Sequence, residues 1–376
     1  MKYMGSKRWM LQNGLGTLLR AECADAKRFV DLFAGSGAVA CFVAQQAALP
    51  VLASDLQMFS VILTEAIIAR DKPLDVDRIW EEWFGAAQQS FPRIRIPEVG
   101  ILTRGEVTAF RDWSETRRAW LVTHAYGGHY FSPLQATWID VLRRAIPEHE
   151  PVRTLALAAL IFAASRCAAS PGHTAQPFQP TCTAKRYLRE AWRKDITICT
   201  LQALRVIAPQ HARIKGQALV ADANIMANQL EPGDLAFIDP PYSSVQYSRF
   251  YHVLETIARG TSGEVSGVGR YPAYELRPQS KFSVKKHSLA ALQELIKTVA
   301  ERKAKAILTF PDQDCSNGLS GEIVKETAAG LFRVKTKTID SKFSTLGGNA
   351  RMYDAGKGRE ARQMAKELIL TLVPKK

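Results

Sequence analysis

The sequence has two blocks of strand-like segments, and the long stretch between them shows no strand alternation. In the first block, an apolar run at 28–33 leads into a turn with two glycines at 34–37, and residues 38–46 have a helical pattern. A second apolar run, 50–55, ends at an aspartate. Strand, helix and strand in this order are typical of the start of a βαβ unit.

The second block repeats this alternation of strand and helix. Short apolar strands are predicted at 218–222, 235–238 and 306–310, and residues 292–299 place apolar side chains at helical spacing. The segment 259–269, rich in glycine and serine, is expected to be a mobile loop.

The last two predicted strands lie at 332–338 and 368–373, and we expect them to pair antiparallel across a long loop. The chain is therefore expected to form an α/β fold with a doubly wound, mostly parallel Rossmann-like sheet that ends in an antiparallel hairpin. Residues 1–60 and 217–376 would make this domain, and residues 61–216 would form a helical insertion within it.

Charge and composition limit the classes of partner. Lys and Arg number 50 against 36 Asp and Glu, and the net charge of +14 favours a polyanion, because each basic side chain that meets a phosphate releases counterions. Apolar residues make up 47% of the 376 residues, which excludes global disorder. The longest apolar stretch, 155–165, is too short to span a membrane, and residues 1–14 have no apolar secretion signal. We therefore expect a cytoplasmic protein.

The cysteines show no pattern of a metal or disulfide site. Six cysteines are scattered along the chain without a C-x-x-C pair. Buried thiols in a reducing compartment are the expected interpretation, and no metal site is predicted.

Two features of the first block point to a ribose-bearing cofactor. The turn at Gly35 and Gly37 lets the backbone approach a ligand closely, but Ala40 stands where a dinucleotide-binding sequence has its third glycine. Asp55 ends the second strand, where an acid can accept hydrogen bonds from both ribose hydroxyls. An ordinary strand–helix turn and a solvated aspartate are the alternatives for each feature alone. Together they predict a cofactor at the carboxyl ends of the strands, of a kind that they do not specify.

The most specific signal is the tetrapeptide after the apolar run 235–238, namely Asp239, Pro240, Pro241 and Tyr242. Two successive prolines remove two backbone donors and fix φ, so carbonyl oxygens are presented rigidly beside a carboxylate. Asp239 and the Pro240 carbonyl can each accept one N–H of an amino group, and the Tyr242 ring can stack on a planar base. A simple turn that ends a strand is the alternative.

In their order along the chain, these motifs resemble those of the Dam-like (α-class) N6-adenine DNA methyltransferases. The set comprises K-Y-M-G-S-K at 2–7, D-L-F-A-G-S-G at 31–37, Asp55, I-D-P-P-Y at 238–242, and L-G-G-N at 346–349, which looks like the Asn-Gly-Gly loop of that family. The helical middle matches the family's target-recognition region in position only.

The resemblance implies roles for individual residues. Tyr3 and Lys7 would contact S-adenosylmethionine, and Asp239 would lie beside it. Phe33, Gly35 and Gly37 would shape the pocket for its methionine and sugar. Asp55 would hold its ribose, and Asp222 would reach its adenine edge. For the target adenine, the catalytic residues would be Asp239, Pro240 and Tyr242. Tyr3 and Ser6 depart from the family, because close relatives carry Trp and Gly there.

The implied reaction transfers a methyl group to the N6 amine of a flipped-out adenine in double-stranded DNA, with no metal. The resemblance implies a role in restriction–modification beside a separate endonuclease, or as an orphan modifier in bacteria or phages, and we expect a monomer. The alternatives are the same chemistry on cytosine N4 or on RNA adenine, and a non-catalytic DNA-binding subunit. The missing third glycine and the Asp-Pro-Pro-Tyr segment disfavour a nicotinamide oxidoreductase.

Two groups of side chains are predicted to contact DNA, namely Lys185, Arg186 and Arg189 in a basic stretch, and Tyr247 and Arg249 after the Asp-Pro-Pro-Tyr segment. A solvated helix face and a helix start with a buried aromatic side are the respective alternatives. The polar, proline-interrupted segment 170–183 is a candidate recognition loop.

Overall fold

The computed structural model describes residue 5, residues 7–344 and residues 362–375. Tyr3 and the predicted Asn-Gly-Gly-like loop at 346–349 lie outside these residues. The described chain divides into two compact units. The sheet unit consists of the described parts of 5–56, 219–246 and 279–375, and the helical unit consists of 57–218 and 247–278.

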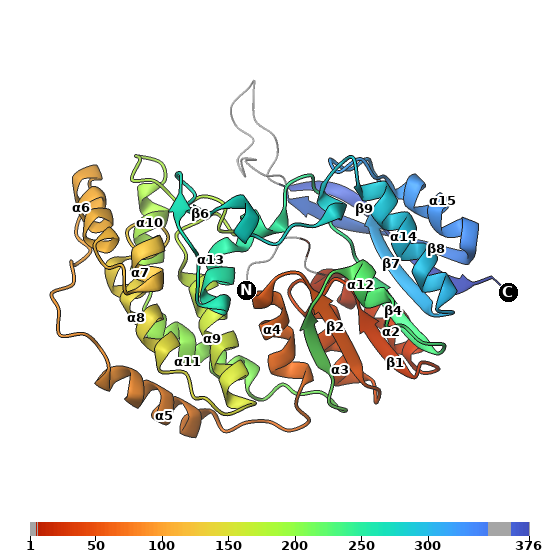
Figure 1. The fold of residues 1–376 in the computed structure, drawn as a ribbon, viewed down its shortest axis with the longest axis horizontal. Helices are drawn as coiled ribbons and strands as arrows, with labels where there is room; N and C mark the ends of the chain where they lie inside the picture. The colour runs from red at the N-terminus through yellow and green to blue at the C-terminus, as the bar shows by residue number, and fades with distance from the viewer. Residues whose placement is uncertain (1–4, 6, 345–361, 376) are drawn as a thin grey trace. The chain divides into compact units, whose positions relative to one another are not determined.

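Within the described residues, the main sheet has seven strands in the order β3-β2-β1-β4-β7-β9-β8 (Figure 1). Their bounds are β1 Arg28–Asp31, β2 Val51–Asp55, β3 Gln217–Val220, β4 Asp234–Ile238, β7 Lys305–Pro311, β8 Phe332–Ser344 and β9 Arg362–Pro374. Strand β1 runs parallel to β2 and β4, β4 runs parallel to β7, and β9 runs antiparallel to both β7 and β8. The predicted α/β class, with a mostly parallel sheet and a closing antiparallel hairpin, is confirmed.

Helices cover both faces of this sheet. Alternate strand residues such as Val30 pack with Leu292 in one apolar core, which also holds side chains of α12 (Ala223–Ala227), α14 (Ser288–Glu301) and α15 (Gly321–Leu331). On the opposite face, the rings of Phe29 and Phe237 stack with centroids 6.4 Å apart. There α3 (Ala38–Gln46) packs on β1 and β2, and α2 (Gly16–Cys23) packs on α3. Both faces of the central strands are therefore buried, which explains their continuous apolar runs.

Short helical segments complete the sheet unit. They are α1 Arg8–Met10, the π-helical segment η1 Leu11–Leu15 and the 3-10 turn η3 Lys281–Ser283. Asn13 and Gly14 have non-helical backbone angles inside η1, so the chain is kinked between the first residues and α2.

The helical unit is built around one helix that is buried along its length. Helix α9 (Val152–Cys167) carries apolar side chains on all its faces and packs against α4 (Met58–Ile68), α8 (Pro133–Arg144), α11 (Ile196–Ile207) and α13 (Tyr247–Arg259). A helix that is apolar all round is typical of the core of a protein. No helix in the described ranges is long and apolar enough to cross a membrane.

Side-chain caps define where the other helices of this unit begin. Thr103 and Glu106 form a reciprocal capping box on α6 (Arg104–Glu115), and Ser132 and Gln135 form another on α8. Aspartates cap α5 (Val76–Gln89) and α11. The remaining elements are α7 Leu121–Tyr126, α10 Lys185–Trp192, β5 Val265–Ser266, β6 Tyr271–Pro272 and the 3-10 turn η2 Tyr274–Leu276.

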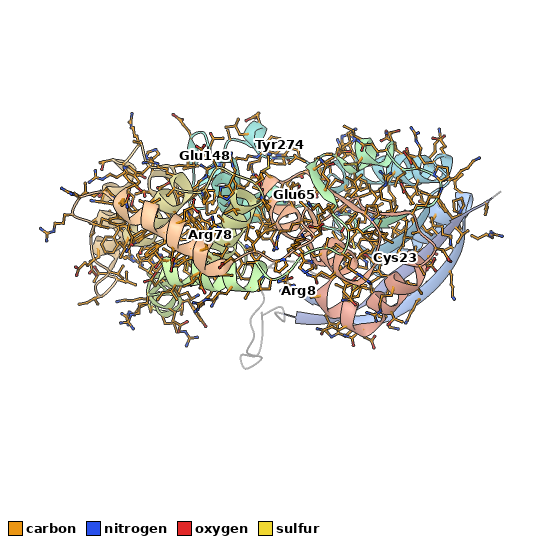
Figure 2. All side chains as sticks on the ribbon, turned by 90° about the horizontal axis from the view of Figure 1, so that it is seen from below. Arg8, Cys23, Glu65, Arg78, Glu148 and Tyr274 are labelled. Atoms are coloured by element: carbon orange, nitrogen blue, oxygen red, sulfur yellow. The ribbon has the colours of Figure 1, made fainter. Side chains whose placement is uncertain are left out.

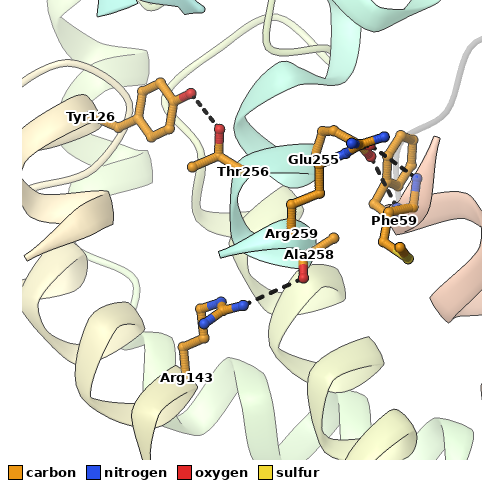
Figure 3. Close-up of polar contacts among 8 residues, drawn as sticks. Phe59, Tyr126, Arg143, Glu255, Thr256, Ala258 and Arg259 are labelled. Atoms are coloured by element: carbon orange, nitrogen blue, oxygen red, sulfur yellow. Dashed lines mark hydrogen bonds and ion pairs between the residues drawn. The ribbon is translucent and has the colours of Figure 1, made fainter. Parts of the chain in front are cut away.

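By their contacts, residues 247–278 group with the helical unit, whereas the sequence analysis placed 217–376 in the sheet domain. Figure 3 shows polar contacts between α13 and other helices of the helical unit. Glu255 accepts the backbone N–H of Phe59 at 3.1 Å, at the start of α4, and the Tyr126 and Thr256 hydroxyls lie 2.8 Å apart. Arg143 donates to the Ile257 carbonyl at 2.6 Å. These bonds tie α13 to three helices of the insertion, which no sequence pattern around 247–278 indicates.

The expected mobile loop at 259–269 contains part of an ordered hairpin. Strand β5 pairs antiparallel with β6, Val265 opposite Pro272 and Ser266 opposite Tyr271. The Gly269 carbonyl accepts hydrogen bonds from buried partners, the Tyr130 hydroxyl at 2.9 Å and the His252 ring at 2.8 Å. The segment expected to be a loop thus contains a short strand, and its mobility stays a prediction.

A single arginine joins the ends of two helices in the helical unit. The Arg70 side chain is 4% exposed and donates to four carbonyls, those of Ala66 at 2.7 Å, Lys72 at 2.9 Å, Ile207 at 2.7 Å and Ala208 at 2.8 Å. It thereby satisfies carbonyls at the end of α11 that have no partner within the helix.

Substitution Arg70→Met keeps the apolar stem and removes these donors. We expect a loss of about 2–4 kcal/mol in the free energy of unfolding, because buried carbonyls lose charged partners. Urea unfolding followed by circular dichroism measures the effect. Arg78 lies exposed on α5 (Figure 2), so Arg78→Met should leave the urea midpoint unchanged. Equal midpoints for wild type and Arg70→Met would contradict this role.

Candidate active site

Aspartates follow the carboxyl ends of four neighbouring strands of the sheet. Asp31 ends β1, Asp55 ends β2, Asp222 follows β3 and Asp239 follows β4. Because β1, β2 and β4 run parallel, their carboxyl ends meet at one edge of the sheet. This edge is where open α/β sheets bind ligands.

The glycine turn after β1 is tied to the end of β2. Gly35 and Gly37 have φ values of 52° and 72°, a left-handed conformation that glycine adopts without strain. The Asp55 Oδ2 atom accepts the Gly35 N–H at 2.9 Å, and the Ser54 carbonyl accepts the Ala34 N–H at 2.9 Å. The structure therefore brings three predicted cofactor residues, Gly35, Gly37 and Asp55, into one small loop.

Two further side chains line this part of the sheet edge. The Phe33 ring meets Phe282 edge-on, with centroids 5.1 Å apart. Asp31, which the sequence interpretation did not single out, is 1% exposed and accepts the Phe33 N–H at 3.2 Å. Burial raises the pKa of Asp31 to about 8, and the nearby charges of Asp239 and Asp55 add to this shift. Asp31 is therefore mainly protonated at neutral pH.

Asp239 belongs to a buried network of opposite charges. Its Oδ1 atom lies 3.0 Å from the Lys7 Nζ atom and accepts the Thr309 hydroxyl at 2.9 Å. The same Nζ atom lies 3.2 Å from Oε2 of Glu367 on β9. Lys7 is 4% exposed, so its ammonium is held between two carboxylates away from solvent.

This network sets the ionisation of its members. Burial raises the pKa of Asp239 above its usual range, the Lys7 ammonium opposes the shift, and Glu367 adds to it. Burial alone would lower the pKa of Lys7, but the two carboxylates outweigh it and raise that pKa well above its usual value. Lys7 therefore stays charged and, together with the Thr309 hydroxyl, favours the ionised form of Asp239.

The residues after Asp239 are held by the rest of the sheet unit. A Cβ atom at Gly5 would lie 3.0 Å from the Tyr242 hydroxyl, so the chain at residue 5 passes close to the ring. Gln246 exchanges two hydrogen bonds with the backbone of Ser280, at 2.8 and 2.9 Å. Both polar atoms of its amide therefore hold the backbone at residue 280.

The two groups predicted to contact DNA lie on two helices of the helical unit. On α10, Arg186 is exposed over the Tyr187 ring, Arg189 donates to the Ile101 carbonyl at 3.2 Å, and Lys185 is half-buried. On α13, Tyr247 meets Phe250 edge-on, and exposed Arg249 donates to the Tyr271 hydroxyl at 3.2 Å. The structure thus brings each group together on its own helix.

Residues 3–309 match the model of a family described as D12 class N6 adenine-specific DNA methyltransferase. The chain belongs to this family. The family inferred from the sequence motifs is therefore confirmed, and the methyl donor of a methyltransferase of this kind is S-adenosylmethionine.

Curated proteins of similar sequence carry related names. The chain is 22% identical to modification methylase StsI of Streptococcus sanguinis over 303 residues, which are 80% of this chain and 42% of that protein. It is 26% identical to modification methylase LlaI of Lactococcus lactis subsp. lactis over 275 residues, 71% of this chain and 40% of that protein. It is also 26% identical to Type II methyltransferase M.FokI of Planomicrobium okeanokoites over 281 residues, 71% of this chain and 38% of that protein. The chain spans about two fifths of the length of these relatives.

The sheet edge of this D12-class chain suits the chemistry of S-adenosylmethionine. That molecule carries a sulfonium, an ammonium and ribose hydroxyl groups, all of which favour carboxylates. Asp55 supplies a carboxyl group beside a glycine turn whose backbone a ligand can approach closely. Asp222 uses its Oδ1 atom to accept the Asn224 N–H, as the cap of α12, so its predicted reach to an adenine edge stays a prediction. In the described parts of the chain, no group of three or more His, Cys, Asp or Glu side chains is arranged to hold a metal ion.

Sequence reasoning missed two residues of the charge network. Thr309 is a polar residue inside the apolar run of β7, and Glu367 is the acid that opens the apolar run of β9. The polar residue inside the apolar run of β7 is a signal that could have pointed to Thr309, whereas no local pattern marks Glu367. Lys7 was predicted to contact the cofactor; the structure places its amine on Asp239 and Glu367, so the cofactor contact stays a prediction.

Substitution Asp55→Ala should loosen the glycine turn. The lost bond to the Gly35 N–H has a charged acceptor, and such bonds contribute about 1.5–3 kcal/mol, so amide hydrogen exchange at residues 34–37 should become roughly tenfold to a hundredfold faster. Mass spectrometry of peptides that cover the turn measures this rate. Asp222→Ala is the matched control, since that carboxylate caps α12 and leaves the turn intact. Unchanged exchange in Asp55→Ala would show that Asp55 does not hold the turn.

Proposed function

We propose that this chain transfers a methyl group from S-adenosylmethionine to the N6 amine of a flipped-out adenine at a specific site in double-stranded DNA. The observation that carries the proposal is Asp239 at the end of β4, held by Lys7 and Thr309 and followed by two prolines and Tyr242. Family membership supports the choice of base and nucleic acid.

The geometry of Asp239 supports amine binding. Among the described residues, Lys7 and Thr309 both meet Oδ1, so Oδ2 is the oxygen that would accept one N–H of the adenine amine. The Pro240 carbonyl would accept the other N–H, and Tyr242 would stack on the base. Two such acceptors favour a pyramidal nitrogen whose lone pair is available for attack, because they draw it out of conjugation with the ring.

Catalysis would rest on positioning. S-adenosylmethionine, when bound, supplies a methyl group on a positively charged sulfur and thus an electrophilic carbon. Asp239 and Pro240 would orient the nitrogen towards it, and direct transfer needs no covalent intermediate with the protein. Asp239 need not be a strong base, since methylation makes the nitrogen positively charged, and its proton can then pass to Asp239 or to water. The target adenine must leave the helix first, because its amine cannot be reached inside a duplex.

The two units would divide the work. The sheet unit would bind the cofactor and carry out the transfer, and the helical unit would bind and recognise DNA. Its candidate DNA contacts are Lys185, Arg186 and Arg189 on α10 and Tyr247 and Arg249 on α13. We include residues 247–278 in this recognition unit, in line with the structural division.

The biological setting follows from the names of the relatives. Two of them are called modification methylases, and their sources are bacteria. In line with these sources, the chain would act in the bacterial cytoplasm. We also propose that it acts as a monomer and without a metal ion. It would protect DNA from a separate endonuclease or act as an orphan modifier.

Modification-sensitive long-read sequencing tests the activity. DNA from cells that express the wild-type chain should carry N6-methyladenine at one short motif, and DNA from cells that express Asp239→Ala should not. Nucleoside mass spectrometry of the same DNA and of cellular RNA separates the alternative products. Methylcytosine or modified RNA adenine would replace the proposed substrate, and the absence of any new methylation would contradict the enzymatic proposal.

The purified Asp239→Ala variant should bind DNA like the wild type and methylate it roughly 100-fold or more slowly, because it lacks the acceptor that orients the amine. A filter-binding assay and labelled methyl transfer measure the two properties. Asp234→Asn is the control at the other end of β4, where the carboxylate pairs with Arg28 at 2.6 Å. It should lose stability but retain its turnover per folded molecule. Full activity in Asp239→Ala would exclude the mechanism.

The pH dependence of methyl transfer should respond in opposite directions to two neighbours of Asp239. The rate falls as the pH drops through the pKa of Asp239, because the protonated Oδ2 atom no longer accepts the N–H of the amine. Lys7 lowers that pKa, so Lys7→Met should move the acid limb to higher pH. Glu367 raises it, so Glu367→Gln should move the limb to lower pH.

Asp31 lies near Asp239, and, besides burial, the charge of Asp239 raises the pKa of Asp31. Asp31 is unchanged in both variants, so its influence is common to all the profiles. Single-turnover rates at saturating DNA and cofactor give the profiles. Shifts in the same direction for Lys7→Met and Glu367→Gln would contradict the electrostatic role of the network.

A further inference from the structure

The Pro-Pro turn after β4 lacks the donors that normally hold a turn. Pro240 and Pro241 have no N–H groups, and their rings fix φ, so the rotations about ψ decide where the carbonyls and Tyr242 point. A bond to the Pro241 carbonyl fixes one of these rotations from outside. In the structure, that bond comes from the side chain of Asn317, whose Nδ2 atom donates to the Pro241 oxygen at 2.8 Å.

Asn317 holds a second carbonyl at the same time. Its Nδ2 atom also donates to the Phe282 oxygen at 3.0 Å, and the Phe282 ring meets Phe33 beside the glycine turn. A single amide therefore joins the turn proposed to receive the target base to the aromatic pair beside the proposed cofactor loop. Both N–H groups of the amide are used, so its orientation is determined.

The surrounding chain holds Asn317 in place. Its side chain is fully buried, and its Oδ1 atom accepts the Leu319 N–H at 3.2 Å. Its own carbonyl accepts the Ser288 hydroxyl at 2.8 Å. Gly318 follows with a φ of 89°, which permits the tight reversal after the asparagine. Asn317 is thus a preorganised donor, with its rotamer set before any ligand binds.

The residue before Asn317 provides an independent second tie. The Ser316 hydroxyl accepts the Ser244 N–H at 3.0 Å, just after Tyr242. The loop between β7 and α15 therefore forms hydrogen bonds with the segment after Asp239 at two residues, Pro241 and Ser244. On the Pro240 carbonyl, by contrast, no hydrogen bond is found among the described residues. The loop thus occupies one proline carbonyl and leaves the other for an amine.

We propose that Asn317 is a positioning residue for methyl transfer, which orients the Pro241 peptide and thereby the Pro240 carbonyl and the Tyr242 ring towards the target amine. This inference rests on the proposed function. Asn317 lies beyond residue 309, where the family match ends, so its role is argued from its contacts alone.

Asn317→Ala tests the proposal against Asn224→Ala. Asn224 is another buried amide of the sheet unit that donates to two partners, the Ala291 carbonyl at 3.1 Å and Glu294 at 2.7 Å, and it has no bond to the catalytic turn. Both variants should lose thermal stability. Only Asn317→Ala should lower the single-turnover rate, by roughly tenfold to a hundredfold, since small misplacements of reacting groups have effects of this size.

The kinetic pattern distinguishes positioning from general damage. The KM for DNA should stay unchanged in Asn317→Ala, and its acid limb should lie where that of the wild type lies, since Asn317 does not contact Asp239. Asn317→Asp keeps the shape and the acceptor for Leu319 but has no donor for the two carbonyls. It should lose as much rate as the alanine variant. A wild-type rate in either variant would overturn the inference.

Amide hydrogen exchange of residues 241–246 separates this inference from the proposed function. Exchange there should be faster in Asn317→Ala than in wild type or in Asn224→Ala. Unchanged exchange would show that Asn317 does not hold the turn, whether or not the methyl-transfer rate of the variant changes. A further outcome is that exchange rises in Asn317→Ala while the wild type transfers no methyl group to any nucleic acid. In that case the proposed function fails, and the catalytic part of the inference fails with it. The finding that Asn317 holds the turn would remain.

Discussion

The Lys7 ammonium between Asp239 and Glu367 is the interaction on which the candidate site depends. Several aspartate side chains lie buried or partly buried at the carboxyl edge of the sheet. Burying an ionised carboxylate there without a partner costs free energy. One cation shared by two carboxylates offsets much of that cost at the point where the proposed chemistry takes place. Removal of Lys7 would leave two buried carboxylates without their shared cation, and removal of either carboxylate would change the field at the other, so the three residues act as a unit.

Each acid of this edge is accommodated by a different physical means. Asp31 is buried, and burial raises its pKa to about 8. Asp55 accepts a backbone N–H of the glycine turn and so fixes the loop that approaches the cofactor. Asp239 remains ionisable because Lys7 and Thr309 hold its Oδ1 atom. Three aspartates at one edge of a sheet therefore differ in role: Asp31 has a raised pKa, Asp55 anchors a loop, and Asp239 can accept an N–H of an amine.

The sequence predicts what is local and misses what is long-range. The glycine turn, Asp55 and the Asp-Pro-Pro-Tyr segment can be found because their chemistry lies within a few consecutive residues. Glu367 cannot, since 360 positions separate it from Lys7 and only the pairing of β9 with β7 brings it to the site. The grouping of residues 247–278 with the helical unit is long-range in the same sense. The bonds that hold α13 in the helical unit come from three other helices, and the pattern of 247–278 contains no trace of them.

The Pro-Pro turn shows why a short motif is incomplete as a description of a site. Proline makes the turn rigid in φ, but it also removes the N–H groups with which a chain anchors itself. The rigid segment must then be oriented by groups outside the motif, and here these are the side chains of Asn317 and Ser316. Such donors can lie anywhere in the chain, provided that the fold brings them to the turn. In this chain the motif contributes the acceptors, and the loop before α15 determines which of the two proline carbonyls stays available to a substrate.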